Sequence, residues 1–212
     1  MQLQKCKEAI INMANLIGSR IERKEDKKFL TGKGRYTADI NLARQTHAYF
    51  VRSPHARAKI TKVDISKASK APGVVTILTG DDLAKDKIGG LIAGWKIVSQ
   101  DGKDMKIPPH PALTKDSVNF VGDHVAVVIA ETLEQAKNAA EQVNVSYKIQ
   151  KAVVNTADAT SSEAIHEGID NNLCFDFLLG DKGKTDEAFS KADKIIKLDL
   201  INNRLIPNAM EP

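Results

Sequence analysis

The sequence predicts an α+β domain that carries one long irregular loop. Residues 125–130 form a continuous apolar run, typical of a strand that is buried on both faces. Apolar residues then recur at helical spacing across 133–143, and apolar and polar residues alternate across 143–149. Residues 84–112 show neither period and contain many of the glycines and prolines, which indicates a loop.

The composition is that of an ordinary globular protein. The 212 residues are 42% hydrophobic and 27% charged, and a chain of this length can bury a core without disulfides. Bases and acids are interspersed and aromatic residues make up 5%, which does not favour a nucleic-acid surface. No segment reaches the roughly 20 apolar residues of a membrane span, and the first residues do not resemble a secretory signal. We therefore expect a cytoplasmic protein with no nucleic-acid partner and no membrane span.

Several short elements are expected in the N-terminal half. They are a short helix within residues 1–14, a strand at 48–52, another short element at 60–65, a buried strand within 74–80, and one helical turn from Asp81. Asp64 and Ser66 offer side-chain oxygens for capping a helical turn around Ala68. Pro54 disfavours helix at the residue before it and so marks a break after the first strand.

The passage from 118 to 149 is the most regular one. Thr132 and Gln135 have the spacing of a capping box, which places a helix start directly after the apolar strand. The expected inner face of that helix comprises Leu133, Ala136, Ala140 and Val143. The alternation that follows indicates a second strand, so the passage predicts strand, helix, strand.

The C-terminal part is expected to begin with a linker at 155–163. A turn at 180–183 precedes a short helix at 186–191, with Phe189 pointing inward. A half-buried strand then carries Ile196, Leu198 and Leu200 on its inner face. Because this strand runs directly into the chain end, we expect the chain to be part of a longer protein.

No local motif specifies a catalytic site. Gly32 and Gly34 lack the preceding strand and the third glycine of a dinucleotide loop. Cys6 and Cys174 form no metal-binding spacing and are interpreted as free thiols. The histidines show no paired spacing, and His124 at the start of the apolar strand is interpreted as structural; they are His47, His55, His110, His124 and His166.

Seven separated stretches, in order, resemble the α/β hammerhead region of the aldehyde oxidase and xanthine dehydrogenase family. They are Arg23-Lys-Glu-Asp with Phe29-Leu-Thr-Gly-Lys-Gly-Arg-Tyr36, Phe50-Val-Arg-Ser-Pro-His-Ala56, Ala71-Pro-Gly-Val74, Val121-Gly122 with Val125-Ala126, the helix from 136 to 143, Val145-Ser-Tyr147, and the ending Asn203-Arg-Leu-Ile-Pro-Asn-Ala-Met-Glu-Pro212. The ending, with Gly180-Asp-Lys and Phe189 before it, is most similar to large subunits of the aerobic carbon monoxide dehydrogenase type.

The resemblance implies a hammerhead domain followed by the start of a molybdopterin-binding domain. It implies a leader at 1–16, the hammerhead domain at 17–154, and at 155–212 a linker with the truncated start of the cofactor-binding domain. Family large subunits hold a molybdenum pyranopterin cofactor, usually as the cytosine dinucleotide in bacteria. Their partners are a medium FAD-binding subunit and a small 2Fe-2S subunit, besides the rest of the large subunit.

The resemblance assigns no catalytic, cofactor-binding or metal-binding residue to these 212 positions. The family's cofactor loop, copper-bearing loop and catalytic glutamate lie beyond the Glu211-Pro212 motif, so no cofactor is expected on this part alone. Cys174 does not match the copper cysteine, and Glu211 does not match the catalytic base. The loop corresponding to 84–110 lies near the substrate funnel in relatives. Its candidate lining residues are Trp95, Ile107, Pro108, Pro109 and His110.

Three functions remain open at this point. The first is a scaffold part, inactive alone, of a carbon monoxide dehydrogenase-type molybdenum hydroxylase. The second is the same scaffold in a relative that acts on an aldehyde, a purine or another N-heteroaromatic substrate. The third is a free-standing interaction module without catalysis.

Overall fold

The computed structural model describes residue 18, residues 22–203, and residues 205 and 206. The chain divides into a compact unit, Arg44–Leu200, and a second unit that comprises Met1–Ala43 and Ile201–Pro212. In the described part, no helix has the length and apolar character needed to cross a membrane. The N-terminal helix expected within residues 1–14, Cys6 and the Glu211-Pro212 ending lie outside the described residues.

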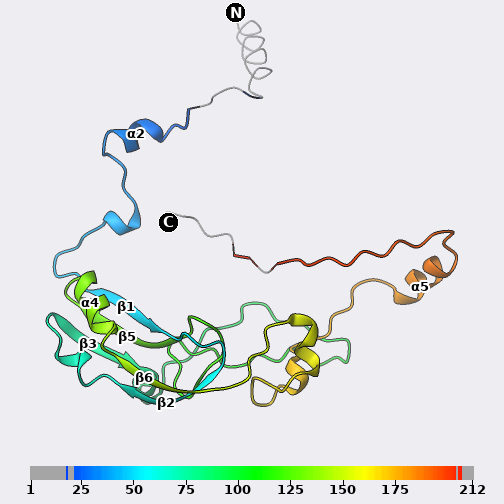
Figure 1. Ribbon diagram of the computed structural model, residues 1–212. Coiled ribbons are helices and arrows are strands. Elements are labelled where there is room, and N and C mark those ends of the chain that lie inside the picture. The colour runs from blue at the N-terminus through cyan, green and yellow to red at the C-terminus, as the bar shows by residue number, and fades with distance from the viewer. Residues whose placement is uncertain (1–17, 19–21, 204, 207–212) are drawn as a thin grey trace, which may run out of the picture. The chain divides into compact units, whose positions relative to one another are not determined.

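The first sheet of the larger unit is built around the predicted buried strand. This strand, β5 (His124–Ala130), lies between β1 (His47–Arg52) and β3 (Val74–Thr79) and pairs antiparallel with both (Figure 1). Val125 and Val128 are fully buried, which explains why β5 shows no polar alternation. His124 stacks on Phe50 with ring centroids 4.5 Å apart, in agreement with its structural interpretation.

Helix α4 (Leu133–Ala140) packs against β1 and β5 of this sheet. Its capping box is the predicted one: Gln135 N donates to Thr132 Oγ1 at 3.2 Å, and Thr132 N donates to Gln135 Oε1 at 3.0 Å. Ala136 and Ala139 are fully buried, and their small side chains let the helix lie close to the sheet. Leu133, expected on the inner face, is 44% exposed because it lies in the first turn at the edge of the contact.

The second sheet has the order β4-β2-β6 and is antiparallel throughout. Its strands are β4 (Ser117–Val118), β2 (Ala58–Asp64) and β6 (Asn144–Ile149), and β6 is the predicted strand after α4. A small core of Ala58, Val118 and Val125 forms against this sheet. Since Val125 belongs to β5, the two sheets are joined through that strand.

The remaining elements are short. They are α2 (Asp26–Leu30) and η1 (Thr37–Asp39) in the second unit, and η2 (Ala68–Lys70), α3 (Gly80–Lys85), η3 (Thr156–Ser161), η4 (Asp170–Asn172) and α5 (Lys182–Ser190) in the larger one. Helix α3 is the helical turn predicted from Asp81. Residues 84–112 beyond it contain a single isolated bridge, between Val98 and Asp104, within the part of the chain described.

Two predictions in the N-terminal half need correction. Strand β3 was expected to be buried, but it is an edge strand: Ile77 is buried and Val75 is 59% exposed. Asp64 does not cap η2, whose first residue is preceded by Lys67 without a side-chain cap. Its Oδ1 instead accepts hydrogen bonds from the backbone and hydroxyl of Ser66, at 3.1 and 2.7 Å, and closes the turn after β2.

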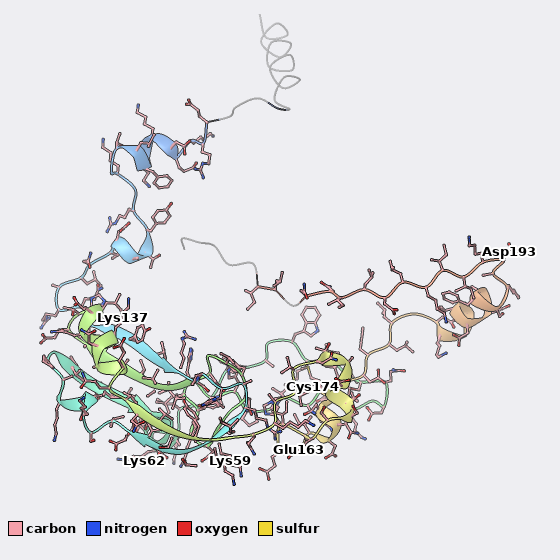
Figure 2. The ribbon with its side chains drawn as sticks, in the orientation of Figure 1. Lys59, Lys62, Lys137, Glu163, Cys174 and Asp193 are labelled. Carbon is pink, nitrogen blue, oxygen red and sulfur yellow. The ribbon has the colours of Figure 1, made fainter. Side chains whose placement is uncertain are left out.

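Three predictions in the C-terminal part were also wrong. Helix α5 starts at Lys182 rather than 186, because Asp181 Oδ1 accepts from Lys184 N at 2.9 Å and caps the helix inside the expected turn. Phe189 is 55% exposed and α5 buries no residue. The expected strand at 196–200 is extended but pairs with no strand in the described part of the chain (Figure 2). A β-ladder requires a neighbouring strand, and no such strand lies beside this segment in the described part of the chain. The apolar side chains beyond Asp193 therefore stay exposed.

Candidate functional site

The larger unit contains an open groove of about 960 Å³. Four segments line it: α3, the irregular loop after α3, the segment that leads through β4 to β5, and residues 165–167. The lining is mainly aliphatic, with Leu83, Ile88 and Leu113 among its members, and two histidines, His110 and His166, join it. An apolar groove with a few polar groups is the usual form of a small-molecule site.

The groove gathers four of the five loop residues singled out from the sequence. Ile107, Pro108, Pro109 and His110 all line it. Trp95 does not, and its side chain lies in solvent with 82% of the residue surface exposed. Four of the five candidate residues thus share one groove and Trp95 lies outside it; their role as lining of a substrate funnel stays a prediction.

Two close backbone approaches fix that wall. Leu91 N donates to the carbonyl of His110 at 2.8 Å, and a Cβ atom on Gly90 would lie 2.4 Å from the same oxygen. A Cβ atom on Gly80, at the start of α3, would lie 2.5 Å from the carbonyl oxygen of Thr114. Only glycine permits such contacts, so the loop is held in a defined position despite its lack of regular structure.

His166 is a groove residue that sequence reasoning did not identify. It is half-buried; burial lowers the pKa of its imidazole, and coulombic interactions with Arg57 and with His110 lower that pKa further. The imidazole is therefore neutral at pH 7, when it offers one donor and one acceptor. His110 and His166 lie in distant parts of the sequence, and no local spacing connects them.

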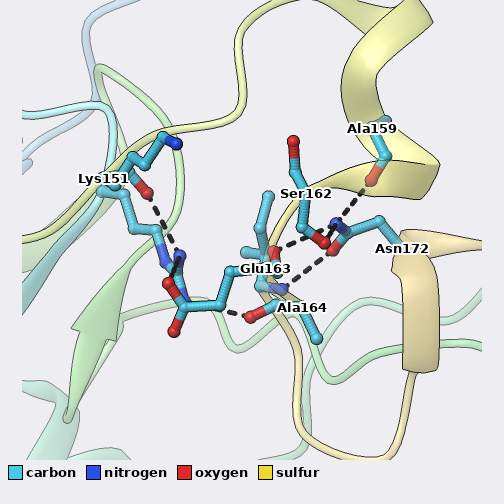
Figure 3. A network of polar contacts seen from close by, with 8 residues as sticks. Lys151, Ala159, Ser162, Glu163, Ala164 and Asn172 are labelled. Carbon is cyan, nitrogen blue, oxygen red and sulfur yellow. Dashed lines mark hydrogen bonds and ion pairs between the residues drawn. The ribbon is translucent and has the colours of Figure 1, made fainter.

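A buried arginine holds the segment that carries His166. Arg57 in the turn before β2 is 8% exposed, and its guanidinium donates to the carbonyl oxygens of Lys151 at 3.1 Å and Ala164 at 3.0 Å. The Glu163 carboxylate lies 3.7 Å from the same group at the surface (Figure 3). The planar fork of arginine matches two separate carbonyls, which lysine cannot do.

Asn172 closes the same segment from its other side. Its Oδ1 accepts from Ile165 N at 2.8 Å, while its Nδ2 donates to the carbonyls of Ala159 at 2.9 Å and Glu163 at 3.1 Å (Figure 3). The backbone of Asn172 has φ of 53°, a conformation that asparagine tolerates better than most residues. Arg57 and Asn172 thus fix residues 163–166 next to the groove without themselves lining it.

The buried carboxylate at the floor of the groove has a structural role. Asp123 is 3% exposed, and its two oxygens accept backbone hydrogen bonds from Asn119 at 3.0 Å and His124 at 3.1 Å. Burial raises the pKa of Tyr147, the Ser53 hydroxyl lowers it, and the charge of Asp123 raises it. These bonds occupy Asp123 in the turn that leads into β5.

The described residues supply no ligand set for a metal ion. No group of three or more His, Cys, Asp or Glu side chains gathers anywhere in that part of the chain. Cys174 is a free, half-buried cysteine, and its carbonyl accepts from Lys106 N at 2.8 Å. The groove offers apolar walls together with histidines and charged side chains that include Lys115, Asp116 and Glu167, an arrangement that suits the passage or binding of an organic molecule.

Several known proteins are similar to this chain in sequence. The chain is 35% identical over 189 residues to the nicotine 6-hydroxylase large subunit of Paenarthrobacter nicotinovorans, covering 86% of this chain and 22% of that protein. It is 31% identical to the carbon monoxide dehydrogenase large chain of Afipia carboxidovorans, covering 92% of this chain and 24% of that one. The chain thus spans about a quarter of the length of these relatives.

The fold agrees with a solved structure from the same group. The crystal structure of a Cu,Mo-CO dehydrogenase superimposes with a TM-score of 0.64 and 29% identity, covering 84% of this chain and 23% of that one. Residues 31–151 match the profile of the aldehyde oxidase and xanthine dehydrogenase a/b hammerhead domain. This range contains both sheets, α4 and most of the groove. The chain therefore belongs to the aldehyde oxidase and xanthine dehydrogenase family and contains its α/β hammerhead domain.

Proposed function

We propose that this chain is the hammerhead scaffold of the large subunit of a molybdenum-dependent hydroxylase of the carbon monoxide dehydrogenase type. The observation that carries the proposal is the likeness to the Cu,Mo enzyme, which extends over 84% of this chain. The two antiparallel sheets and their central β5 form a rigid support. In this proposal the support holds the loop after α3, which forms one wall of the groove through which substrate reaches the reacting centre.

The proposed division of the chain has three parts: a leader at 1–16, the hammerhead domain at 17–154, and the start of the cofactor-binding domain at 155–212. The profile match over 31–151 supports the middle part. The unpaired apolar segment at 196–200 supports the last part, because such a segment suits a sheet completed by other residues.

The cofactor of the proposed enzyme is molybdenum on a pyranopterin, in the cytosine dinucleotide form. When bound it supplies the redox chemistry of hydroxylation, and the protein positions and shields it. No residue described here forms a ligand set for the metal. Electrons then pass to a medium FAD-binding subunit and a small 2Fe-2S subunit, which are the proposed partners together with the rest of the large subunit.

The chain's own contribution is the groove wall formed by Ile107, Pro108, Pro109 and His110. Its apolar side chains exclude water from an uncharged substrate, and the imidazoles of His110 and His166 offer hydrogen bonds. Trp95 lies outside the groove and serves as the comparison residue. In the assembled enzyme, Ile107→Ala and His110→Ala are expected to raise KM several-fold, while Trp95→Ala leaves KM unchanged.

An N-heteroaromatic substrate is the second candidate. The relative with 35% identity is a nicotine hydroxylase, and a groove of about 960 Å³ with apolar walls accommodates an aromatic ring. Carbon monoxide needs no such volume. The two candidate enzymes have the same proposed cofactor and subunits, and they differ in the substrate that enters the groove.

The test is to purify the native complex through an affinity tag on this chain. Metal analysis, flavin and iron–sulfur spectra, and dye-linked oxidation of carbon monoxide, an aldehyde and nicotine then separate the candidates. Oxidation of carbon monoxide supports the first proposal and oxidation of nicotine the second. The isolated 212-residue chain is expected to hold no stoichiometric molybdenum and to oxidise none of these compounds. A native complex that also lacks molybdenum and redox subunits would show a free-standing interaction module instead.

A further inference from the structure

The irregular loop that forms one wall of the groove contains a small hairpin at residues 97–106. Ser99 N donates to the carbonyl of Lys103 at 2.8 Å, and Gly102 N donates to the carbonyl of Ser99 at 2.9 Å. Gly102 has a φ of 79°, the left-handed conformation that a tight hairpin turn of this kind requires. The hairpin is therefore an ordered element inside a loop that otherwise lacks regular structure.

The segment that follows η4 docks on this hairpin from a distant part of the sequence. The carbonyl of Asp176 accepts from Gln100 N at 2.9 Å, and Asp176 N donates to the hydroxyl oxygen of Ser99 at 3.2 Å. Lys106 N donates to the carbonyl of Cys174, which is labelled in Figure 2, at 2.8 Å. Since Gln100 belongs to the turn and Lys106 to the last part of the hairpin, the segment is held at both ends of the hairpin.

These contacts connect two walls of the groove by a short path. Lys106 is followed directly by Ile107, the first residue of the wall that the loop contributes. The opposite wall begins at Ile165, whose N–H donates to Asn172 Oδ1 at 2.8 Å (Figure 3). Asn172 lies close to Cys174 in the sequence, so the bonds at these two residues link one wall to the other.

Each wall also has a support of its own on the rest of the larger unit. The carbonyl of His110 in the loop wall accepts from Leu91 N at 2.8 Å. The guanidinium of Arg57 donates to the carbonyl of Ala164, directly before the opposite wall, at 3.0 Å. Neither contact joins the two walls, so the hairpin and the segment after η4 add a separate connection between them.

We propose that the hairpin 97–106 and residues 173–176 form a latch, which holds the two walls of the groove together and widens the groove when it is released. Ser99 is the positioning residue of the latch, because its hydroxyl supplies the side-chain acceptor. The latch consists of a few hydrogen bonds on exposed backbone, and such regions open locally at a lower cost than global unfolding. This inference concerns access to the groove and does not depend on the proposed enzymatic function.

The rate at which a maleimide labels Cys174 in the full 212-residue chain reports on the latch. Cys174 is half-buried and lines a small cavity between the hairpin and residues 173–176, and Cys6→Ser in every variant leaves it as the single thiol. Ser99→Ala removes the acceptor of Asp176 N. It is expected to raise the labelling rate about fivefold, the effect of one lost hydrogen bond. Ser99→Thr retains the hydroxyl and is expected to restore the wild-type rate.

Hydrogen exchange followed by mass spectrometry tests whether the latch acts on both walls. In Ser99→Ala, exchange is expected to rise about fivefold in peptides that contain Lys106, and about twofold or more in peptides that contain Ile165. Strand β5 should keep its protection. Ser69→Ala in η2 is the matched control, since it removes a hydroxyl that donates to the carbonyl of Ser66 at 3.3 Å, away from the groove. It should leave both labelling and exchange unchanged.

Four results would overturn the proposal. They are equal labelling of wild type and Ser99→Ala, a Ser99→Thr variant that labels as fast as Ser99→Ala, an exchange increase that leaves Ile165 as in the wild type, and a loss of protection in β5. The last result would mean that Ser99 supports the whole fold, because an opened latch leaves the two sheets intact.

Discussion

Arg57 is the charged side chain on which the wall of the groove depends most directly. Its two carbonyl partners, at Lys151 and Ala164, follow β6 by different distances along the chain, so one guanidinium ties two backbone segments together. A buried charge is tolerated only when it is hydrogen-bonded, and these carbonyls and Glu163 meet that condition. The sequence gives no sign of this role, because both partners are backbone atoms.

Arg57→Ala is expected to destabilise the fold by about 2–3 kcal/mol, since two part-buried charge-assisted hydrogen bonds to backbone carbonyls are lost. Lys59→Ala, two residues further on in β2, is the control, because Lys59 is exposed, and it should change stability by less than about 0.5 kcal/mol. Urea unfolding followed by circular dichroism measures both. Equal effects of the two substitutions would contradict the role assigned to Arg57.

Gly73 shows how a single glycine supports a helix start. Its φ is 74°, and a Cβ atom there would lie 2.3 Å from the side-chain amide of Gln135. Gln135 is flexible enough to move away, but doing so breaks its bond to Thr132 N in the capping box of α4. The cost of a side chain at 73 therefore combines backbone strain with the loss of a cap.

Gly73→Ala is expected to destabilise the fold by about 2 kcal/mol, of which about 1 kcal/mol is strain from the positive φ. Gly102→Ala is the matched control: its φ is 79°, but no atom lies within 4 Å of the added Cβ. In a Gln135→Ala background, Gly73→Ala should cost no more than Gly102→Ala does. Chemical denaturation of these variants completes a double-mutant cycle. If Gly73→Ala costs as much free energy of unfolding in the Gln135→Ala background as in the wild type, the clash with Gln135 is ruled out.

At the scale of single elements, the sequence predicted best where local and tertiary signals agree. The sequence predicted β5, α4 and β6 correctly. In this passage the spacing of the apolar residues and the capping residues Thr132 and Gln135 indicate the same structure. The strand at 196–200 shows the opposite case. Its alternation is as regular as that of β6, but the pattern specifies only a conformation, and no neighbouring strand completes the ladder.

Helix α3 illustrates a short element whose stability depends on pH. The Asp82 carboxylate accepts from Thr79 N at 2.8 Å and from the Thr79 hydroxyl at 2.7 Å. These two bonds lower the pKa of Asp82, the hydroxyl contributing most. Since Leu83 and Ala84 of this helix line the groove, the cap also positions part of the site.

Asp82→Asn is expected to reduce the loss of stability on acidification. The folded-state pKa is depressed, so the carboxylate stabilises the fold above its unfolded pKa of about 4 and loses this effect as pH falls through the folded value. The variant lacks the titrating group, so its urea unfolding midpoint should fall less steeply than that of the wild type as the pH drops below about 4. Asp86→Asn, at an exposed position one turn on, provides the control. Identical pH profiles for wild type and Asp82→Asn would contradict this account.

At the scale of the whole molecule, the candidate site was only partly predictable. The loop from 84 to 112 was recognisable as a functional candidate because glycine and proline interrupt every period, and four of its five selected residues do line the groove. His166 and its support by Arg57 and Asn172 were not predictable, since the chain brings them together only by folding. Trp95 was a candidate because its loop lies near the substrate funnel in relatives, and membership of a loop carries no information about the direction of a side chain.

The larger unit should resist proteolysis in its two sheets and be cleaved first beyond α5. Lys194 and Lys197 are exposed and lie in an extended, unpaired backbone, which a protease can bind directly. Lys59 and Lys62 on β2 are also exposed, but Lys59 is paired with both β4 and β6 and Lys62 is paired with β6. Limited trypsin digestion with mass spectrometry should therefore show cleavage after Lys194 and Lys197 well before cleavage after Lys59 or Lys62. Early cleavage within β2 would instead mean that the second sheet opens easily, and the groove wall tied to it through Arg57 would then lack a rigid support.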